Sequence, residues 1–467
     1  MPPQLAAILF TIGIAGLFFL DRDKNVRVSK ALWIPTLWLF FCLSRSLSLW
    51  LGMSPPVTDM ASAYLEGSPI DRALFIGLEI VALIVVIGRA RRVGAILRRN
   101  WPICLFFSYA ALSIVWSDYH LVTLKHWIKG IGDLMMVLIV LSEPDVLGAL
   151  RRLFTRLGFV LVPLSVLFIK YYPQLGRVLN LSWEMEPVGV ATQKNGLGEL
   201  CDFLGLVLLW RLRSAYNDRK DPNRKGRLLA LGAVLTMVIW LLWTCNSMTS
   251  ICALSMACII MLFSTKPAFR RKPALVHVLV VALLSVTIYA LFFQSSGSLL
   301  ENLGRNPTLT GRTEIWHAAF TVPNSRLFGA GYESFWLGNR LQAMWRAVPG
   351  LRVNEAHNGY IEIVLTLGYI GAILLAILIV TGYRNVITAY RRHPEMASLR
   401  MAFFFGAVTN ALTEAAFRMM GPPWIAFLLA TIAAPEYFAF KSGRGNQLSR
   451  SAQSGDVAVP EQVLTGC

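Results

Sequence analysis

Residues 310–317 read TGRTEIWH, residues 329–336 read GAGYESFW, and residues 355–358 read EAHN. All three runs lie between Gln294 and Tyr360, the one long hydrophilic interval in a chain that otherwise alternates apolar runs with short basic loops. Arginines, tryptophans, histidines and glycines, which let a backbone come close, occur together there. This mixture favours an anionic, carbohydrate-bearing substrate over a simple connection between two membrane spans.

The composition is that of a helical membrane protein. The chain has 467 residues, of which 55% are hydrophobic and 15% are charged, whereas soluble domains carry about 25% charged residues. Apolar runs long enough for a transmembrane helix recur from end to end. We therefore predict an all-α, polytopic bundle of about 12–13 transmembrane helices with one long periplasmic loop.

Short loops rich in arginine and lysine separate the apolar runs and fall on one side throughout. The positive-inside rule assigns them to the cytoplasm, so the net charge of +18 does not call for nucleic acid as a partner. The predicted spans are residues 5–20, 31–52, 73–88, 101–116, 121–141, 153–170, 195–210, 228–243, 248–263, 275–293, 360–381, 401–417 and 424–440. The N-terminus and the long loop then lie outside.

Four parts follow from this alternation. Residues 1–293 form a transmembrane region with short basic cytoplasmic loops, and residues 294–358 form the long periplasmic loop with the candidate catalytic motifs. Residues 359–440 supply the C-terminal transmembrane helices. Residues 441–467 form a cytoplasmic tail rich in Ser, Gly and Gln that we expect to be disordered.

No cofactor and no metal are predicted. None of the seven cysteines lies in the long loop and no C-x-x-C occurs, so neither a disulfide framework nor a zinc site is indicated. The run Asp21-Arg22-Asp23 resembles a metal-binding D-x-D, but it lies among basic residues on the predicted inner side. Nucleotide-binding glycine motifs are absent from the sequence.

Ionisable residues inside predicted spans are functional candidates, because an unpaired charge in lipid is costly. Arg45 lies in the second span. In the fifth span Lys125, Lys129 and Asp133 are four residues apart and stack on one helical face. Either Lys129 and Asp133 neutralise each other, or this face turns its positive charge toward the outer cavity.

The second outer loop carries two further basic candidates. Arg177 follows a glycine, and Lys194 stands at the start of the next span. A helix N-terminus offers free N–H groups and a positive dipole end, which favour a phosphate. Both residues are therefore candidate phosphate ligands.

These motifs resemble the O-antigen ligase and Wzy-type polysaccharide polymerase superfamily, in particular its exopolysaccharide-polymerase-like branch. The resemblance covers nearly the whole chain. Its marks are LWIP at 32–35 with Ser44-Arg45, residues 125–133, 170–177, 193–198, 311–316 and 329–336, AHN at 356–358 with Leu367-Gly368, and Glu414. His126 departs from the pattern, in which an arginine is expected between Lys125 and Trp127.

The resemblance implies a metal-independent, inverting glycosyltransferase of the bacterial inner membrane. Its donor would be a glycan on undecaprenyl diphosphate at the periplasmic face. The acceptor would be a sugar hydroxyl, on another lipid-linked glycan for a polymerase or on lipid A-core for a ligase. Polysaccharide-export machinery is a candidate partner, beside the lipid bilayer.

The residues fit this chemistry. Arg177 and Arg312 would bind the diphosphate through planar, bidentate donors, and His357 would take the acceptor proton near neutral pH. His317 competes for the role of the base, but His357 lies at the mouth of a span. The remaining candidates for substrate binding are Lys194, Arg305, Arg45, Lys129, Tyr332, Trp336 and Asn358.

Two alternatives stay open. Tyr332, Trp336, Trp316 and Trp345 could stack on sugar rings, or they could pack the loop against the membrane surface. A transporter or flippase of the same lipid would also carry basic residues in a cavity. Transporters usually show broken spans in two repeated halves, and no internal repeat is evident in this sequence.

Overall fold

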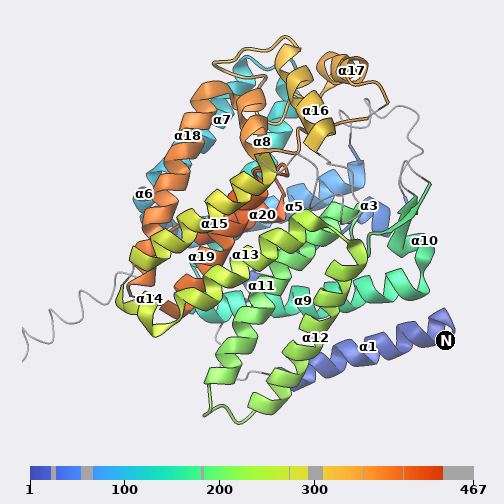
Figure 1. Cartoon of the computed structure of the whole chain (residues 1–467), viewed down its shortest axis with the longest axis vertical. Coiled ribbons are helices and arrows are strands. Elements are labelled where there is room, and N and C mark those ends of the chain that lie inside the picture. The colour runs from blue at the N-terminus through green and yellow to red at the C-terminus, as the bar shows by residue number, and fades with distance from the viewer. Residues whose placement is uncertain are drawn as a thin grey trace, which may run out of the picture.

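Apolar helices make up almost all of the computed structural model, shown in Figure 1. The structure describes residues 1–22, 28–53, 67–179, 183–272, 274–292, 309–350, 352–392 and 394–434. Within these ranges two short strands form one antiparallel hairpin. The prediction of a polytopic helical membrane protein is confirmed.

The elements of the N-terminal half are α1 (Pro3–Leu20), η1 (Lys30–Leu32), α2 (Trp33–Cys42), α3 (Leu47–Trp50), α5 (Pro69–Gly88), α6 (Ala90–Arg99), α7 (Trp101–Leu112), η2 (Ser113–Val115), α8 (His120–Leu141), α9 (Val146–Tyr171), α10 (Pro173–Gly176), β1 (Arg177–Leu179), β2 (Met185–Pro187) and α11 (Lys194–Asn217). Those that follow are α12 (Arg224–Cys245), α13 (Met248–Ser264), α14 (Pro267–Arg271), α15 (Ala274–Phe292), α16 (Leu309–Thr321), α17 (Gly338–Ala347), α18 (Gly359–Tyr390), α19 (Pro394–Asn410) and α20 (Pro422–Thr431).

Each predicted span coincides with a helix, but fewer of the helices are full spans than predicted. Among the described residues, α1, α9, α12 and α18 are long and apolar enough to cross a membrane. The pair α5 and α6, bent by 91°, makes a fifth if it counts as one span. By this measure of length and composition, fewer helices qualify as transmembrane spans than the predicted 12–13, and several other apolar helices are shorter.

Breaks and buried charges account for this difference. The predicted span 31–52 stops at Cys42, where Ser44 Oγ donates back to Phe40 O at 2.6 Å and Arg45 turns to backbone carbonyls. Helices α8 and α11 are long enough, but ionisable residues interrupt their apolar surface. Helix α19 ends at Asn410, seven residues before the predicted end at 417.

Helix α9 is the centre of the N-terminal half, and most of its residues are buried. It contacts α1, α2, α8, α11 and α12. Phe10 of α1 meets Tyr171 at the end of α9, while Phe18 meets Phe159, so the two helices run antiparallel. The start of α1 therefore lies at the same end of the molecule as α10 and the β-hairpin.

A second hydrophobic cluster lies apart from the main core, in residues 309–350 and 352–358, which we call the cap. Figure 1 shows its helices α16 and α17 at the top, above the ends of α7, α8 and α18. The cluster is formed by buried residues of the cap together with Leu365 of α18, and includes Ile315, Ala319, Phe335, Trp336, Leu341, Met344 and Ala356. The described part of the long hydrophilic interval, from residue 309 onward, is thus a folded unit with its own core.

The cap joins α18 through close backbone contacts at a kink. Ala330 N donates to Leu365 O at 3.0 Å, and Gly331 N donates to Thr366 O at 2.9 Å. Gly368 breaks the helix there with φ of 67°, and a Cβ at this position would lie 2.2 Å from Leu327 O. Glycine is required at the kink because only it allows the two backbones to approach so closely.

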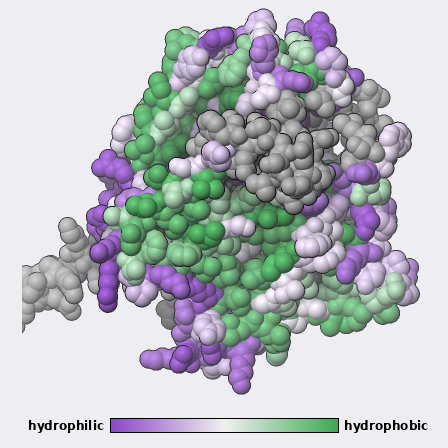
Figure 2. Space-filling model, viewed as in Figure 1, coloured by the Kyte–Doolittle hydropathy of each residue, from purple (hydrophilic) through white to green (hydrophobic). Residues whose placement is uncertain are grey.

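Hydrophilic and apolar residues separate across the surface. On the face in Figure 2, a mostly apolar band lies between hydrophilic residues at the lower left and hydrophilic residues at the top and right. In Figure 1 the basic helices α6 and α14 lie at the left, the turn between α11 and α12 lies at the bottom, and the cap lies at the top. This arrangement suits a protein that crosses a bilayer with its basic loops on one side.

The predicted orientation can be tested with single cysteines in a cysteine-free background. Arg346 on α17 and Lys220 between α11 and α12 are both exposed. We expect a membrane-impermeant maleimide to label Arg346→Cys in spheroplasts and to label Lys220→Cys only after permeabilisation. The opposite pattern would place the cap in the cytoplasm.

Candidate active site

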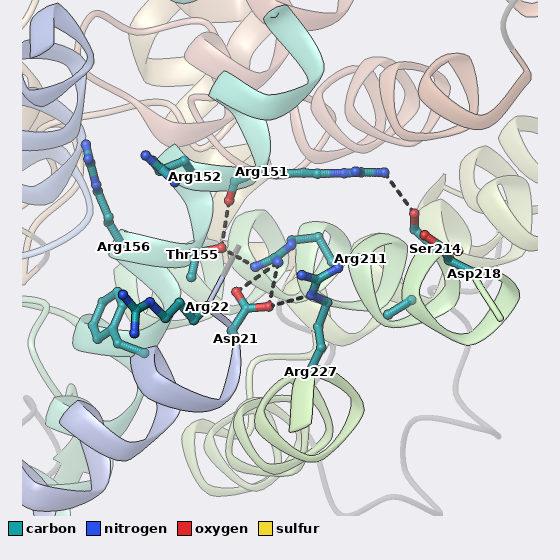
Figure 3. A pocket seen from close by; sticks show the side chains of 12 residues that line it. Asp21, Arg22, Arg151, Arg152, Thr155, Arg156, Arg211, Ser214, Asp218 and Arg227 are labelled. Atoms are coloured by element: carbon teal, nitrogen blue, oxygen red, sulfur yellow. Dashed lines mark hydrogen bonds and ion pairs between the residues drawn. The ribbon is translucent and has the colours of Figure 1, made fainter. Parts of the chain in front are cut away.

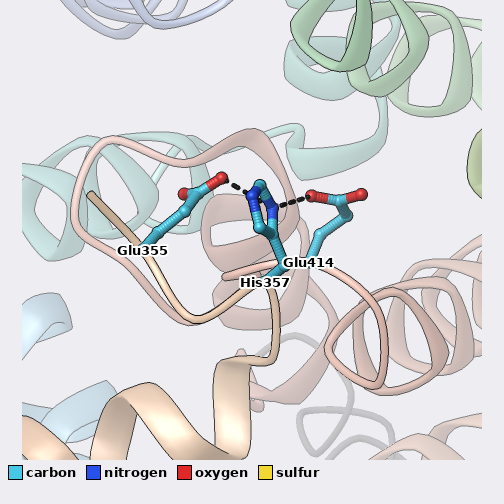
Figure 4. A group of neighbouring side chains, drawn as sticks. All are labelled: Glu355, His357 and Glu414. Carbon is cyan, nitrogen blue, oxygen red and sulfur yellow. Dashed lines mark hydrogen bonds and ion pairs between the residues drawn. The ribbon is translucent and has the colours of Figure 1, made fainter. Parts of the chain in front are cut away.

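His357 lies between two carboxylates at the junction of the cap and α18 (Figure 4). Its Nδ1 is 3.0 Å from Glu355 Oε1 and 3.3 Å from Glu414 Oε2. The imidazole is half-buried, while the side chain of Glu414 is 6% exposed. Because both carboxylates face Nδ1, the ring keeps Nε2 for another partner.

The carboxylates change the protonation of this histidine. Burial acts to lower the pKa of His357, but hydrogen bonds to Glu355 and Glu414 raise it to about 9. Burial acts to raise the pKa of Glu355, but hydrogen bonds and charge interactions with His357 and Arg418 lower it to about 2. The ring is therefore an imidazolium at neutral pH in this structure, which corrects the expected titration near neutrality.

Two arginines bind the outer oxygens of the same carboxylates. Arg312 of α16 donates from Nη2 to Glu414 Oε1 at 3.3 Å and from Nη1 to Thr413 O at 2.7 Å. Arg418 donates from Nη1 to Glu355 Oε2 at 3.0 Å and from Nε to Glu333 Oε2 at 3.3 Å. Burial acts to lower the pKa of Arg418, and the surrounding carboxylates raise it above its ordinary value.

The backbone around His357 is fixed by the start of α18. Asn358 is the N-cap: its Oδ1 accepts from the N–H groups of Tyr360 and Ile361, both at 3.0 Å. Its Nδ2 donates to Leu412 O at 3.1 Å, so its amide serves local structure. His357 has φ of 48°, a left-handed conformation that is uncommon for a residue other than glycine and that positions a ring at a sharp turn.

The start of α11 connects this cluster to the β-hairpin. Asn195 Nδ2 donates to Glu414 Oε1 at 3.2 Å, and Lys194 Nζ forms an ion pair with Glu186 of β2 at 3.0 Å. Arg177 lies on the paired strand β1, is exposed, and donates from Nε to Ile169 O at 3.3 Å. The structure thus connects Arg312 to His357 through Glu414, and it links the hairpin that carries Arg177 to the same cluster through α11.

Arg45 and Lys129 lie outside the cluster. Arg45 donates to the carbonyls of residues 175, 189 and 191, so the side chain fastens the second outer loop. The expected pairing of Lys129 with Asp133 is replaced by other contacts. Asp133 accepts from Trp38 Nε1 at 2.8 Å and from Met420 N at 2.7 Å, and Lys129 Nζ lies 5.8 Å from the centre of the Phe75 ring.

The predicted aromatic contacts to sugar are not available in this structure. Tyr332 is 2% exposed and Trp336 is 7% exposed. Trp336 Nε1 donates to Glu362 Oε2, and Trp316 Nε1 donates to the carbonyl of Ala356. Trp336 and Trp316 pack in the core of the cap, and Tyr332 packs in the main core, so both proposed roles of these rings give way to packing inside the protein.

Two further expectations concern single residues. His317 is exposed on α16, one position beyond Trp316, and is not part of the carboxylate cluster. Arg305 lies outside the described residues.

Glu355, His357 and Glu414 could also hold a metal ion, since their ligand atoms lie within 4.8 Å of one another. Their surroundings oppose this use. Arg312 and Arg418 already bind the outer oxygens of the two carboxylates, and two guanidinium charges at that distance repel a dication. Glu355 and Glu414 therefore fit a protonated His357 ring between them better than they fit a metal ion.

Glu333, Glu355, Glu414 and Arg418 complete the cluster. Glu414 was a mark of the family resemblance, but neither it nor Glu333, Glu355 or Arg418 was among the predicted site residues. Glu414 stood inside the predicted span 401–417 and Arg418 directly after it. A carboxylate in an apolar run is itself a signal, because lipid disfavours an unpaired charge. The same rule that selected Arg45 and Lys129 would have selected Glu414.

Comparisons with known proteins show what this chain is similar to. Residues 232–376, which include Arg312 and His357, match the model of the family described as O-Antigen ligase. The exopolysaccharide production protein ExoQ of Rhizobium meliloti is 27% identical over 290 residues, which cover 60% of this chain and 63% of that protein. The chain thus matches a little under two thirds of the relative's length. The chain is thus similar to the O-antigen ligase family over residues 232–376 and to an exopolysaccharide production protein over a longer stretch.

Proposed function

We propose that this protein transfers a glycan from undecaprenyl diphosphate to a sugar hydroxyl at the periplasmic face of the bacterial inner membrane. The observation that carries the proposal is the environment of His357. Its Nδ1 faces two carboxylates, and Arg312 lies beside one of them. A base oriented by carboxylates next to a cation suits a reaction in which a hydroxyl loses a proton and a diphosphate leaves.

In the proposed step, His357 Nε2 accepts the proton of the acceptor hydroxyl. The hydroxyl oxygen bonds to the anomeric carbon from the side opposite the diphosphate, and the bond from that carbon to the phosphate oxygen breaks. Its electron pair leaves with undecaprenyl diphosphate, and the configuration inverts. Glu355 and Glu414 hold the ring in one tautomer and stabilise the imidazolium that forms, as the aspartate of a serine-protease triad does.

The raised pKa of His357 sets the pH dependence of this step. With a pKa of about 9, the ring must lose its proton before it can act as a base. The basic form therefore increases as the pH rises through this value. The small neutral fraction present at pH 7 is a correspondingly stronger base.

Diphosphate binding is assigned to Arg312, Arg177 and the start of α11. Arg312 is 21% exposed and pairs with Glu414, which in turn contacts His357. The first turn of α11 has no side-chain cap at Gln193, which leaves backbone N–H groups for a phosphate. Arg418 bridges two carboxylates, so we assign it to holding the site together.

Polymerisation is the preferred form of the reaction. The relative ExoQ is named for exopolysaccharide production, which favours another lipid-linked glycan as acceptor. The matching family is described as O-antigen ligase, so transfer to lipid A-core is the second candidate. A polymerase would deliver its product to polysaccharide-export machinery.

The role of His357 is tested by turnover of lipid-linked donor. His357→Ala should lose about 100- to 10,000-fold in rate, whereas the matched control His317→Ala, on the exposed face of α16, should retain activity. Donor binding should survive in His357→Ala, because the arginines carry it. Normal turnover in His357→Ala, or lost donor binding, would remove it as the base.

A pH profile separates a base from a merely structural histidine. The kcat/KM of the wild type should rise with pH and level off near 9, the pKa of His357. Glu355→Gln removes one charge that raises this pKa, so its profile should level off at lower pH and at a lower rate. A profile that Glu355→Gln does not move would contradict the assignment.

Arg312→Ala should abolish transfer, with the protein still present in the membrane. Arg312→Lys should restore little activity, because a point charge does not reproduce the planar fork that binds both Thr413 O and Glu414. Arg346→Ala, which removes an exposed arginine of the cap, is the matched control. Full transfer by Arg312→Ala would exclude it from the site.

Metal independence is tested with purified protein and lipid-linked donor. We expect activity to persist in EDTA, because arginines occupy the outer oxygens of Glu355 and Glu414. Loss of activity that Mg²⁺ or Mn²⁺ restores would instead make Glu355, His357 and Glu414 metal ligands.

A further inference from the structure

A second polar site lies at the opposite end of the bundle, where α1, α9, α11 and α12 meet (Figure 3). It is a cavity of about 230 Å³. Its lining is Phe18, Asp21, Arg22, Arg151, Arg152, Thr155, Arg156, Arg211, Ser214, Ala215, Asp218 and Arg227. Six arginines and two aspartates thus surround one cavity.

This cavity is separate from the candidate active site. Asn195, in the first turn of α11, contacts Glu414, whereas Arg211, near the end of the same helix, lines the cavity. Sixteen residues separate them along α11, which is about 24 Å at 1.5 Å per residue. The cavity also lies on the side of the basic loops.

The aspartates do not balance the arginines. Asp21 Oδ2 lies 2.9 Å from Arg211 Nη2, and its Oδ1 lies 3.1 Å from Arg227 Nε, so this carboxylate is bound by two guanidinium groups. Arg211 also donates to Thr155 Oγ1, which fixes its orientation. With six arginines and two aspartates, the lining carries four more positive than negative side chains, which favours an anionic ligand.

Arg156 provides a specific group for such a ligand. Its guanidinium carbon lies 3.8 Å from the centre of the Trp33 ring, which holds the group by one face. Its Nη1 is buried and has no hydrogen-bond partner among the described residues. Buried donors are normally satisfied, and a phosphate oxygen is a strong acceptor for guanidinium.

The surroundings of the cavity distinguish a lipid from a soluble anion. Phe18 of α1 lines the cavity. The outer face of the same helix exposes Ile8, Leu9, Ile12 and Phe19. That face is apolar along the length of the helix and is suited to contact acyl chains. If the arginines bind the headgroup of a lipid, its acyl chains would therefore lie beside the exposed face of α1.

We propose that this cavity binds the phosphodiester headgroup of an anionic phospholipid, with its acyl chains along the exposed face of α1. Basic pockets between transmembrane helices at the cytoplasmic surface recognise such headgroups by charge and by bidentate arginine contacts. The bound lipid would hold α1 against α9, since the lining residues come from both helices. This site is independent of the proposed transferase reaction.

The test uses the full-length protein, purified in detergent and stripped of lipid. Phosphatidylglycerol and phosphatidylcholine are added back, and bound lipid is measured by native mass spectrometry. We expect selective binding of phosphatidylglycerol. The double variant Arg152→Gln/Arg156→Gln should bind it on the order of 10- to 30-fold more weakly.

A matched variant removes the same charge elsewhere on the same side. Lys220 and Lys225 are exposed and do not line the cavity, so Lys220→Gln/Lys225→Gln should bind phosphatidylglycerol like the wild type. Asp21 and Arg211 are left intact because they hold α1 to α11.

Three results would overturn the proposal. The first is equal binding of both lipids by the wild type, a comparison that does not depend on any variant folding. The second is unchanged phosphatidylglycerol binding by a monodisperse Arg152→Gln/Arg156→Gln protein. The third is displacement of phosphatidylglycerol by an equal concentration of inorganic phosphate, which would identify a soluble anion as the ligand.

Discussion

The ion pairs of Arg418 hold the candidate active site together. Its guanidinium binds Glu333 in the loop that joins α16 and α17 and Glu355 just before α18, at 3.3 and 3.0 Å. Removing one partner of such a group leaves an uncompensated charge next to an apolar core. The neighbouring N–H groups of Met419 and Met420 donate to Glu333 and Asp133, so the segment between α19 and α20 is fastened to the cap and to α8.

The same contacts set the reactivity of the site. Three groups that carry positive charge, Arg312, Arg418 and His357, face three carboxylates, Glu333, Glu355 and Glu414. Glu355 and Glu414 position the ring of His357 and also raise its pKa. All three carboxylates are held by Arg312 or Arg418. Structure and protonation therefore depend on one set of charges. A change made to one member alters the geometry and the pKa values of the others together.

Local sequence signals predicted the helices well and the site in part. Apolar runs and basic loops placed a helix within each predicted span, because hydropathy and charge act over a few residues. The predicted site residues His357 and Arg312 lie in one cluster of charges, but the rings of Tyr332 and Trp336 are buried and Asn358 caps a helix. These roles depend on contacts between residues far apart in the chain, such as Arg312 with Glu414, which spacing along one sequence does not encode. The position of Glu414 in the chain likewise did not show that it would contact His357 and Arg312.

The contact between Asp133 and the backbone of Met420 has a consequence for the biosynthesis of the protein. Asp133 belongs to a helix made early, and it is buried without exposure to solvent. Its partner is among the last parts of the membrane domain to leave the ribosome, together with Glu414 and Arg418. Until then, the translocon or a chaperone would have to accommodate an incompletely paired carboxylate. The candidate active site can consequently assemble only after the segment between α19 and α20 has been synthesised.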